Sequence, residues 1–574
     1  MRRTVWAPLA QRAELVLEDG EHLPMQSGAA GHFEIDNPRL LPGVRYRVSL
    51  DGGPDLPDPR SPFQPEGIDG HSALVAEEFG WTDAGWSAPL LRDAIVYELH
   101  VGTFSPEGTF DGVIRRLDHL TNLGVTAIEL MPVGEFAGRW GWGYDGVDLY
   151  AVRAAYGGPD GLRRFVDACH ERQLAVILDV VYNHLGPSGN HLAKFGPYFT
   201  DAYRTPWGAA MNFDGKGSDG VRDFVIDNAR RWLRDFHLDG LRLDAVHAIH
   251  DESARHIVEE LAEMIGCLEV EVRRRLWLIL ETDRNDPRGV WPPTRGGWGA
   301  TAHWTDDFHH ALHVALTGER SGYYGDFQGW PDVVRALSSP YLYTGQHSTY
   351  RDRRHGREPA GTTGEHFVVC LQNHDQVGNR ARGERLSQLT TPPRLRVAAL
   401  LLLTSPYVPL IFAGEEWAAS TPFLYFSDHE AGLGRRVTEG RRAEFAGFGW
   451  APADVPDPQA EATFTASRLR WEERADPPHA AMIDWYRALI RLRRDHPELG
   501  CGDFRDSRVL TEAGSGWLMV ERGGHLIAAN LGQQRAAIPA PGWGPAQPLA
   551  VTGEATVESD TLLLGPDSAG VWSR

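Results

Sequence analysis

The chain has 574 residues, enough for two to four domains with well-formed cores. Its formal net charge of −21 argues against nucleic acid and anionic membrane surfaces as partners. No signal peptide is visible, and no apolar run reaches the roughly 18 residues of a membrane span, so we expect a cytoplasmic protein.

The first 90 residues are rich in Gly, Pro and short alternating apolar runs, without a helical period. Segments such as 13–17, 32–35 and 46–50 are typical of strands separated by turns. They predict an N-terminal immunoglobulin-like β-sandwich module over residues 1–90. The module could bind glycan, or it could be a structural sandwich packed on the next domain.

Between residues 91 and 497, strand signals alternate with helical periods, which predicts a parallel sheet covered by helices. The expected helices lie near 110–123, 162–169, 224–236, 253–272, 308–316, 393–405 and 479–495. The expected strands are 95–101, 125–133, 175–184, 239–247, 276–281, 301–304, 366–375 and 408–416. Eight strands in this arrangement predict an α/β fold, the (β/α)8 TIM barrel. Residues 185–219 are expected to form a long loop, and residues 498–574 a C-terminal antiparallel β domain.

The fourth expected strand carries an unusual charged face. In Gly240-Leu-Arg-Leu-Asp244, the two leucines alternate with Arg242 and Asp244, so a strand places both charges on one side. Arg242 would keep Asp244 ionised, as a covalent nucleophile requires. A buried Arg–Asp ion pair that only fixes the strand would give the same pattern.

Two further carboxylates end other strands, and the active site of a barrel lies at the C-terminal ends of its strands. Asp244, Glu281 and Asp375 would then meet, which suits glycoside cleavage. Asp244 is the expected nucleophile. Glu281 is the expected proton donor, with its pKa raised by the apolar run before it. Asp375 is the expected transition-state stabiliser.

A metallohydrolase barrel is the competing interpretation, with Asp179, His184 and Asp244 as metal ligands. No His-x-His pair stands on the first expected strand, and the four cysteines show no metal-binding spacing. We therefore predict no metal and no cofactor.

The strand-end stretches resemble the four ordered motifs of the α-amylase superfamily of retaining glycoside hydrolases. These are Asp179-Val-Val-Tyr-Asn-His184, Gly240-Leu-Arg-Leu-Asp244, Glu281 after an apolar strand, and Asn373-His-Asp375. Trp142-Gly-Tyr-Asp145 is similar to the stretch after that family's second strand. The resemblance implies the same three carboxylate roles, and it implies sugar contacts by Tyr144, His184, Arg242 and His374. Many members bind calcium through the Asn found here as Asn183, but loop 185–219 offers no cage for it.

Finer stretches resemble the maltooligosyltrehalose trehalohydrolase family within that superfamily. They are 281–288, 304–313, 343–348 and 372–380, and the resemblance covers nearly the whole chain. It implies hydrolysis of the α-1,4-glucosidic bond next to the terminal trehalose of maltooligosyltrehalose, which releases trehalose. It also implies a partner in trehalose biosynthesis, maltooligosyltrehalose synthase.

A trehalose end has no free anomeric hydroxyl, so its recognition needs polar side chains beyond the cleavage point. The candidates are His247, Asp306, Asp307, His309 and Gln376. For Asp306 and Asp307, a charge favoured by a helix N-terminus is a serious alternative explanation.

Two other functions stay open at this point. A glycogen branching enzyme shares the module, the barrel and the carboxylates, but transfers the glucan to another glucan. A non-catalytic glycan-binding barrel protein would share the fold, although such a protein would be expected to have lost at least one of the three carboxylates.

Overall fold

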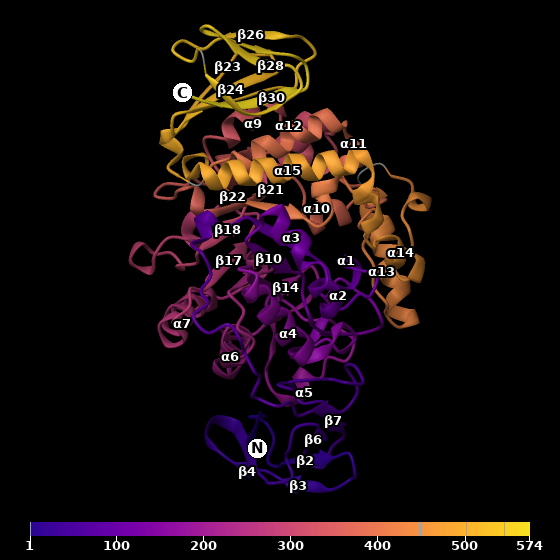
Figure 1. Cartoon of the computed structure of the whole chain (residues 1–574). Helices are drawn as coiled ribbons and strands as arrows, with labels where there is room; N and C mark the ends of the chain where they lie inside the picture. Colours follow the sequence, from indigo (N-terminus) through magenta and orange to yellow (C-terminus); the bar gives the residue numbers. More distant parts are fainter. Residues whose placement is uncertain (1, 447–449, 501, 545) are drawn as a thin grey trace.

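The computed structural model describes residues 2–446, 450–500, 502–544 and 546–574. At its centre, eight parallel strands form a closed barrel, which lies between the first and last strands of the chain (Figure 1). Each barrel strand falls inside a predicted one, so the barrel prediction is confirmed. The strands are β9 (Val96–Leu99), β10 (Ala127–Leu130), β13 (Ala175–Val180), β16 (Gly240–Leu243), β17 (Trp277–Glu281), β18 (Ala302–Trp304), β21 (Phe367–Cys370) and β22 (Val408–Phe412).

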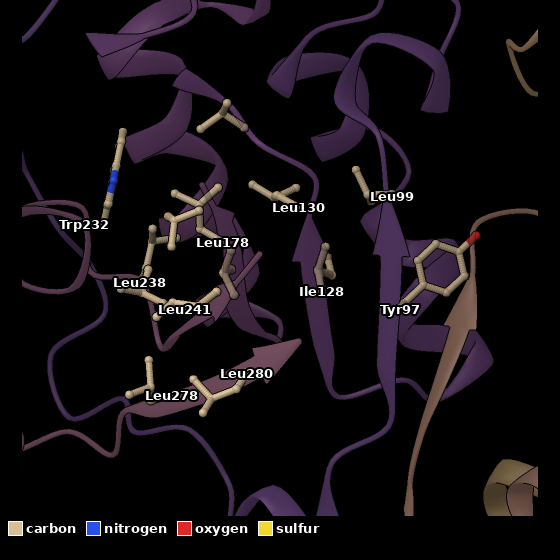
Figure 2. Packing of buried hydrophobic residues seen from close by; sticks show 14 of the residues in the cluster. Tyr97, Leu99, Ile128, Leu130, Leu178, Trp232, Leu238, Leu241, Leu278 and Leu280 are labelled. Carbon is tan, nitrogen blue, oxygen red and sulfur yellow. The ribbon is translucent and has the colours of Figure 1, made fainter. Parts of the chain in front are cut away.

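The barrel strands sort their side chains by alternation. Leu241 and Leu243 of β16 belong to the large apolar cluster between strands and helices, which also takes in Leu178 and Trp232. Figure 2 shows Leu178 and Leu241 beside Trp232 of α6 (Asp219–Asp235). The opposite residues of the strands, such as Ile279, form a separate apolar cluster. Burying one such leucine contributes about 1.5–3 kcal/mol, so the outer face anchors the helices.

The expected helix 110–123 is two helices, which corrects the prediction. These are α2 (Phe110–Ile114) and α3 (Leu117–Leu123), and the break falls where Arg116 leaves helical geometry at φ −115° and ψ 1°. Gly124 ends α3 as expected, at φ 101°, a conformation that glycine adopts without strain. The other helices around the barrel are α4 (Gly158–Glu171), α6, α7 (Ile257–Val272), α8 (Asp307–Thr317), α12 (Pro392–Leu403) and α15 (Pro477–Asp495).

The stretch 185–219, expected to be a loop, contains α5 (Leu192–Phe195) and a hairpin of β14 (Phe199–Thr205) and β15 (Gly208–Met211). The side chains of β14 are exposed or half-buried, so no apolar alternation marks this strand in the sequence. The other insertions at the strand ends include hairpin β11 (Gly134–Phe136) with β12 (Gly146–Val152), hairpin β19 (Thr344–Ser348) with β20 (Arg353–Gly356), α9 (Trp330–Ala336), α10 (His374–Gly378), α11 (Leu386–Leu389), α13 (Ala431–Ala446) and α14 (Glu461–Ala466).

Antiparallel sheets stand at both ends of the chain (Figure 1). At the N-terminal end, β1 (Arg2–Trp6), β5 (His32–Asp36) and β4 (Gln26–Ser27) pair in one sheet. A second sheet joins β3 (His22–Pro24), β2 (Ala13–Leu17), β6 (Arg45–Leu50) and β7 (Asp55–Leu56), and β8 (Ser72–Ala73) also pairs with β6.

The C-terminal strands form a five-stranded and a three-stranded antiparallel sheet. The first has the order β23 (Arg508–Thr511), β24 (Trp517–Arg522), β25 (His525–Asn530), β30 (Ser568–Ser573) and β27 (Gln547–Thr552). The second has the order β26 (Ala536–Pro539), β29 (Thr561–Leu564) and β28 (Ala555–Glu558). Within the described ranges, no helix is both long enough and apolar enough to cross a bilayer.

Candidate active site

Arg242 lies at the centre of the charged residues inside the barrel. Its side chain is fully buried, with the guanidinium carbon 4.3 Å from the ring centre of Trp304. Nη1 donates to Asp179 Oδ2 at 2.7 Å and to Asp244 Oδ1 at 3.0 Å, and Nη2 lies 3.0 Å from Glu281 Oε2. One cation therefore holds three carboxylates from three strand ends, whereas the alternation in β16 predicted only its contact with Asp244.

Asp244 follows β16 and is held on both oxygens. Oδ1 accepts from Arg242, and Oδ2 accepts from Asn183 Nδ2 at 2.8 Å. These two contacts hold both carboxylate oxygens of Asp244 in place. The next residue, Ala245, has a left-handed backbone with φ 41°, which non-glycine residues seldom adopt. This turn points the Ala245 N–H at Glu281.

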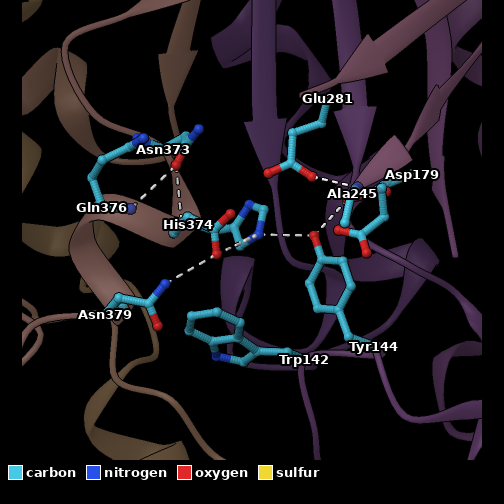
Figure 3. Close-up of polar contacts among 12 residues, drawn as sticks. Trp142, Tyr144, Asp179, Ala245, Glu281, Asn373, His374, Gln376 and Asn379 are labelled. Carbon is cyan, nitrogen blue, oxygen red and sulfur yellow. Dashed lines mark hydrogen bonds and ion pairs between the residues drawn. The ribbon is translucent and has the colours of Figure 1, made fainter. Parts of the chain in front are cut away.

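Glu281 ends β17 and is bound through a single oxygen (Figure 3). Oε2 accepts from the Ala245 N–H at 2.6 Å and also faces Arg242. The Glu281 side chain is about one-fifth exposed, at 22%. The apolar residues of β17 therefore do not enclose it in the way that the sequence suggested.

His374 and Tyr144 pack against each other beside Asp179. Their rings stack with centroids 5.3 Å apart, and His374 Nε2 lies 2.8 Å from the Tyr144 oxygen (Figure 3). The Tyr144 hydroxyl donates to Asp179, whose pKa burial raises to about 7. Asp375 follows His374 as the second residue of the short helix α10. Its Oδ1 accepts from Asn379 Nδ2 at 3.3 Å.

A cleft of about 540 Å³ opens above these groups. Of the sequence-predicted site residues, Tyr144, His184, Asp244, His247, Glu281 and Asp375 line it. Arg242 and His374 lie behind this surface, so they face the cleft only through the carboxylates and Tyr144. The exposed Trp207, on the turn between β14 and β15, also lines the cleft and stacks on His184 with ring centroids 5.2 Å apart.

Helix α13 forms one side of the cleft through residues that include Leu433, Val437 and Arg441. It is tied to the site, because Arg441 Nη1 donates to Asn379 Oδ1 and Nη2 to the Gly378 carbonyl, both at 2.9 Å. Asn379 in turn holds Asp375. This helix connects the edge of the cleft to one of the three carboxylates.

The candidates for the trehalose end separate into different places. His247 lines the cleft. Asp306 lines a smaller polar cavity and accepts from Gln376 Nε2 at 3.1 Å. Burial raises the pKa of Asp306 to about 7, and the nearby charges of Glu281 and Asp375 add to the shift. Gln376 is itself held by the Asn373 N–H, at 2.9 Å (Figure 3).

Asp307 and His309 are engaged in the surrounding structure. Asp307 is the first residue of α8, and its Oδ2 accepts from Asn285 Nδ2 and the Leu342 N–H. His309 is buried, with Nδ1 at the Leu371 carbonyl and Nε2 at the Tyr324 hydroxyl. Burial lowers the pKa of His309 to about 3, so it is neutral. Asp307 lines the smaller cavity, whereas His309 lines neither cavity.

Sequence reasoning did not select Glu98, Asn379 or Arg441. Glu98 accepts from His374 across 276 residues, and Arg441 reaches Asn379 across 62 residues. The one local signal was the acidic residue at the same place in two adjacent apolar strands, Glu98 in β9 and Glu129 in β10.

The catalytic domain of the alpha-amylase family matches residues 74–204. Malto-oligosyltrehalose trehalohydrolase from Mycobacterium tuberculosis is 45% identical, covering 98% of this chain and 96% of that protein. The protein of the same name from Arthrobacter ramosus is 48% identical, over 86% and 87%. A solved structure from Salmonella typhimurium, described provisionally as an alpha amylase, superposes with TM-score 0.91 at 38% identity, over 100% and 97%. The chain therefore belongs to the malto-oligosyltrehalose trehalohydrolase family of α-amylase-type glycoside hydrolases.

Proposed function

We propose that this protein is a retaining glycoside hydrolase that cleaves the α-1,4-glucosidic bond next to the terminal trehalose of maltooligosyltrehalose. Its products are trehalose and a shorter maltooligosaccharide. The observation that carries the chemistry is that Asp244, Glu281 and Asp375 line one cleft at the strand ends. The names of relatives at 45–48% identity support the choice of substrate.

In the first step, Asp244 attacks the anomeric carbon of the glucose on the glucan side of the bond. The glycosidic bond breaks, and Glu281 protonates the leaving oxygen of the trehalose unit. Because both contacts of Glu281 fall on Oε2, we place the transferable proton on Oε1. Arg242 and Asn183 hold the two oxygens of Asp244 in place before the attack.

In the second step, Glu281 takes a proton from water, and the water oxygen displaces Asp244 from the anomeric carbon. Two displacements at one carbon retain the configuration. Asp375 stabilises the oxocarbenium-like transition states through the ring hydroxyls. Tyr144 stacks on the same sugar, and His184, which also lines the cleft, contacts it. Arg242 and His374 act through the groups in front of them.

The trehalose unit would extend from Glu281 toward His247 and the smaller cavity at Asp306 and Asp307. Gln376 would hold Asp306 in place. His309 would shape this region from behind, since both its nitrogens are bound to protein groups.

The wider assignments are part of the same proposal. Residues 1–90 form the N-terminal module, residues 91–497 the catalytic domain and residues 498–574 the C-terminal β domain. The protein works in the cytoplasm on the product of maltooligosyltrehalose synthase, and its reaction needs no metal or cofactor.

Product analysis by chromatography tests this function. Incubation with maltotriosyltrehalose should release free trehalose and maltotriose, while maltopentaose should stay largely intact. Equal cleavage of both would make the protein a general amylase. Longer or branched products would indicate a transferase, and no change in either substrate would favour a binding protein.

A further inference from the structure

Two acidic side chains face each other inside the barrel and have no part in the mechanism above. Glu98 of β9 and Glu129 of β10 are partners in the register of neighbouring strands, and each is 1% exposed. Their surroundings differ. Neither carboxyl oxygen of Glu129 has a hydrogen-bond partner among the described residues, whereas both oxygens of Glu98 are bound.

Glu98 contacts His374 through both of its carboxylate oxygens. Oε1 lies 2.5 Å from His374 Nδ1, and Oε2 accepts from the backbone N–H of the same residue at 3.0 Å. His374 is the first residue of α10, and Asp375 follows it. Glu98 therefore fixes both the imidazole ring and the start of the helix that presents Asp375.

A chain of hydrogen bonds continues from the ring to Asp244. His374 Nε2 lies 2.8 Å from the Tyr144 oxygen, and the Tyr144 hydroxyl donates to Asp179 Oδ2 (Figure 3). Arg242 Nη1 donates to that same Asp179 oxygen and to Asp244 Oδ1. The chain thus runs from β9 across the barrel to the proposed nucleophile.

The protons of this chain determine its direction. Tyr144 has one hydroxyl proton and gives it to Asp179, so its oxygen must accept from His374 Nε2. Nδ1 donates to Glu98 at the same time, which requires a proton on both ring nitrogens. A proton on Asp179 would sit on Oδ1, which has no partner in the described part of the chain, so Oδ2 remains an acceptor.

We propose that Glu98 is a positioning residue that keeps His374 doubly protonated, and so sets the direction of the hydrogen-bond chain that ends on Asp244. The inference rests on the proposed function of this site. Without the charge of Glu98, His374 could lose its Nε2 proton. Tyr144 could then turn its hydroxyl toward Nε2, and Asp179 would lose that donor. The relative strengths of the two hydrogen bonds that Arg242 Nη1 donates, to Asp179 and to Asp244, would then change.

The charges around His374 agree with this role. Burial lowers the pKa of His374, but the carboxylates of Asp375 and Glu98 outweigh this effect and raise it to about 10. Burial raises the pKa of Glu129 well above its usual range. The titratable and charged groups that face His374 are Glu98, His100, Glu129, Tyr144, Asp179, Arg242 and Asp375.

The matched pair Glu98→Gln and Glu129→Gln tests the proposal. Each change keeps size and shape. Only the first alters a contact with His374, because neither carboxyl oxygen of Glu129 has a hydrogen-bond partner among the described residues. The substrate is α-maltosyl fluoride, because fluoride leaves without help from an acid. Deprotonation of Glu281 at high pH then does not slow the first step and does not hide the effect of His374.

The alkaline limb of the kcat profile should move to lower pH by at least one unit in Glu98→Gln and stay in place in Glu129→Gln. An unchanged limb in Glu98→Gln would overturn the proposal.

A direct measurement covers the case in which Glu98→Gln fails to fold. Nitrogen NMR of histidine-labelled wild-type protein should show one ring that stays doubly protonated to at least pH 9 and is missing in His374→Asn. A His374 ring that loses its proton below pH 8 would refute the role of Glu98. This signal needs no turnover. A wild-type protein that cleaves neither maltotriosyltrehalose nor the fluoride would therefore contradict the proposed function alone.

Discussion

The two faces of the barrel strands obey opposite rules. On the outer face, Leu178, Leu241 and Leu278 are buried against helices and have no polar task. On the inner face of the same sheet, Asp179 and Arg242 are as deeply buried, yet they are charged or hydrogen-bonded groups from different strands. The outer face stabilises the fold. The inner face lowers the stability, because its charged groups are held away from water. Changes on the two faces should therefore separate activity from stability.

The largest loss of kcat is expected at Asp244, which follows the inner-face residues of β16. Asp244→Asn removes the proposed nucleophile but keeps both side-chain neighbours. We expect kcat to fall by about 10⁴-fold or more, with the unfolding temperature within a few degrees of the wild type. Steady-state kinetics on maltotriosyltrehalose and a thermal scan are the measurements. Activity near the wild-type rate would remove Asp244 from this role.

Glu281→Gln should follow with a loss of about 10²–10⁴-fold on the same substrate, because the leaving oxygen receives no proton. With α-maltosyl fluoride the first step should be nearly normal, so the covalent intermediate should accumulate and appear by mass spectrometry of the intact protein. An equal loss in the rate of the first step on both substrates would show that Glu281 is not the proton donor. Overall turnover falls on both substrates in either case, because Glu281 is also the base of the second step.

On the outer face, Leu241→Ala should leave the kcat of the folded protein unchanged and lower its stability by about 2–5 kcal/mol, through a cavity under the helices. Leu241 is fully buried. The control is Leu9→Ala, since Leu9 is 78% exposed and should tolerate the change. A stable Leu241→Ala with reduced kcat would reverse the assignment of the two faces. Unfolding by urea, followed by fluorescence, gives the comparison.

The smallest effect concerns the pH dependence of stability at Asp306, whose pKa rises to about 7 in the folded protein. The unfolded side chain titrates near 4, so folding binds a proton between about pH 4 and pH 7, and stability falls as the pH rises through that window. Asp306→Asn cannot titrate and should lose less, on the order of 1–2 °C in unfolding temperature. Parallel curves for the two proteins from pH 4 to pH 7 would contradict this.

The inner face also shows how far the sequence alone could go. The ends of parallel strands meet at one edge, so Asp244, Glu281 and Asp375 could be placed together from strand order. Glu98 could not be joined to His374 in this way, because its contact depends on how the barrel closes between β22 and β9. The place of helix α13 at the site could not be predicted for a similar reason. The helix meets the site only through tertiary contacts, such as that of Arg441 with Asn379.

Ala245 connects the proposed nucleophile to the proposed acid through a backbone conformation that costs about 1–2 kcal/mol for a side chain with a Cβ atom. A glycine at this position would remove that cost. It would also make the backbone more flexible, so the N–H that donates to Glu281 would be held less firmly in position. Higher thermal stability and faster turnover therefore favour different residues at position 245. In a screen for heat-tolerant variants, Ala245→Gly is where we expect a gain in durability to appear together with a slower enzyme.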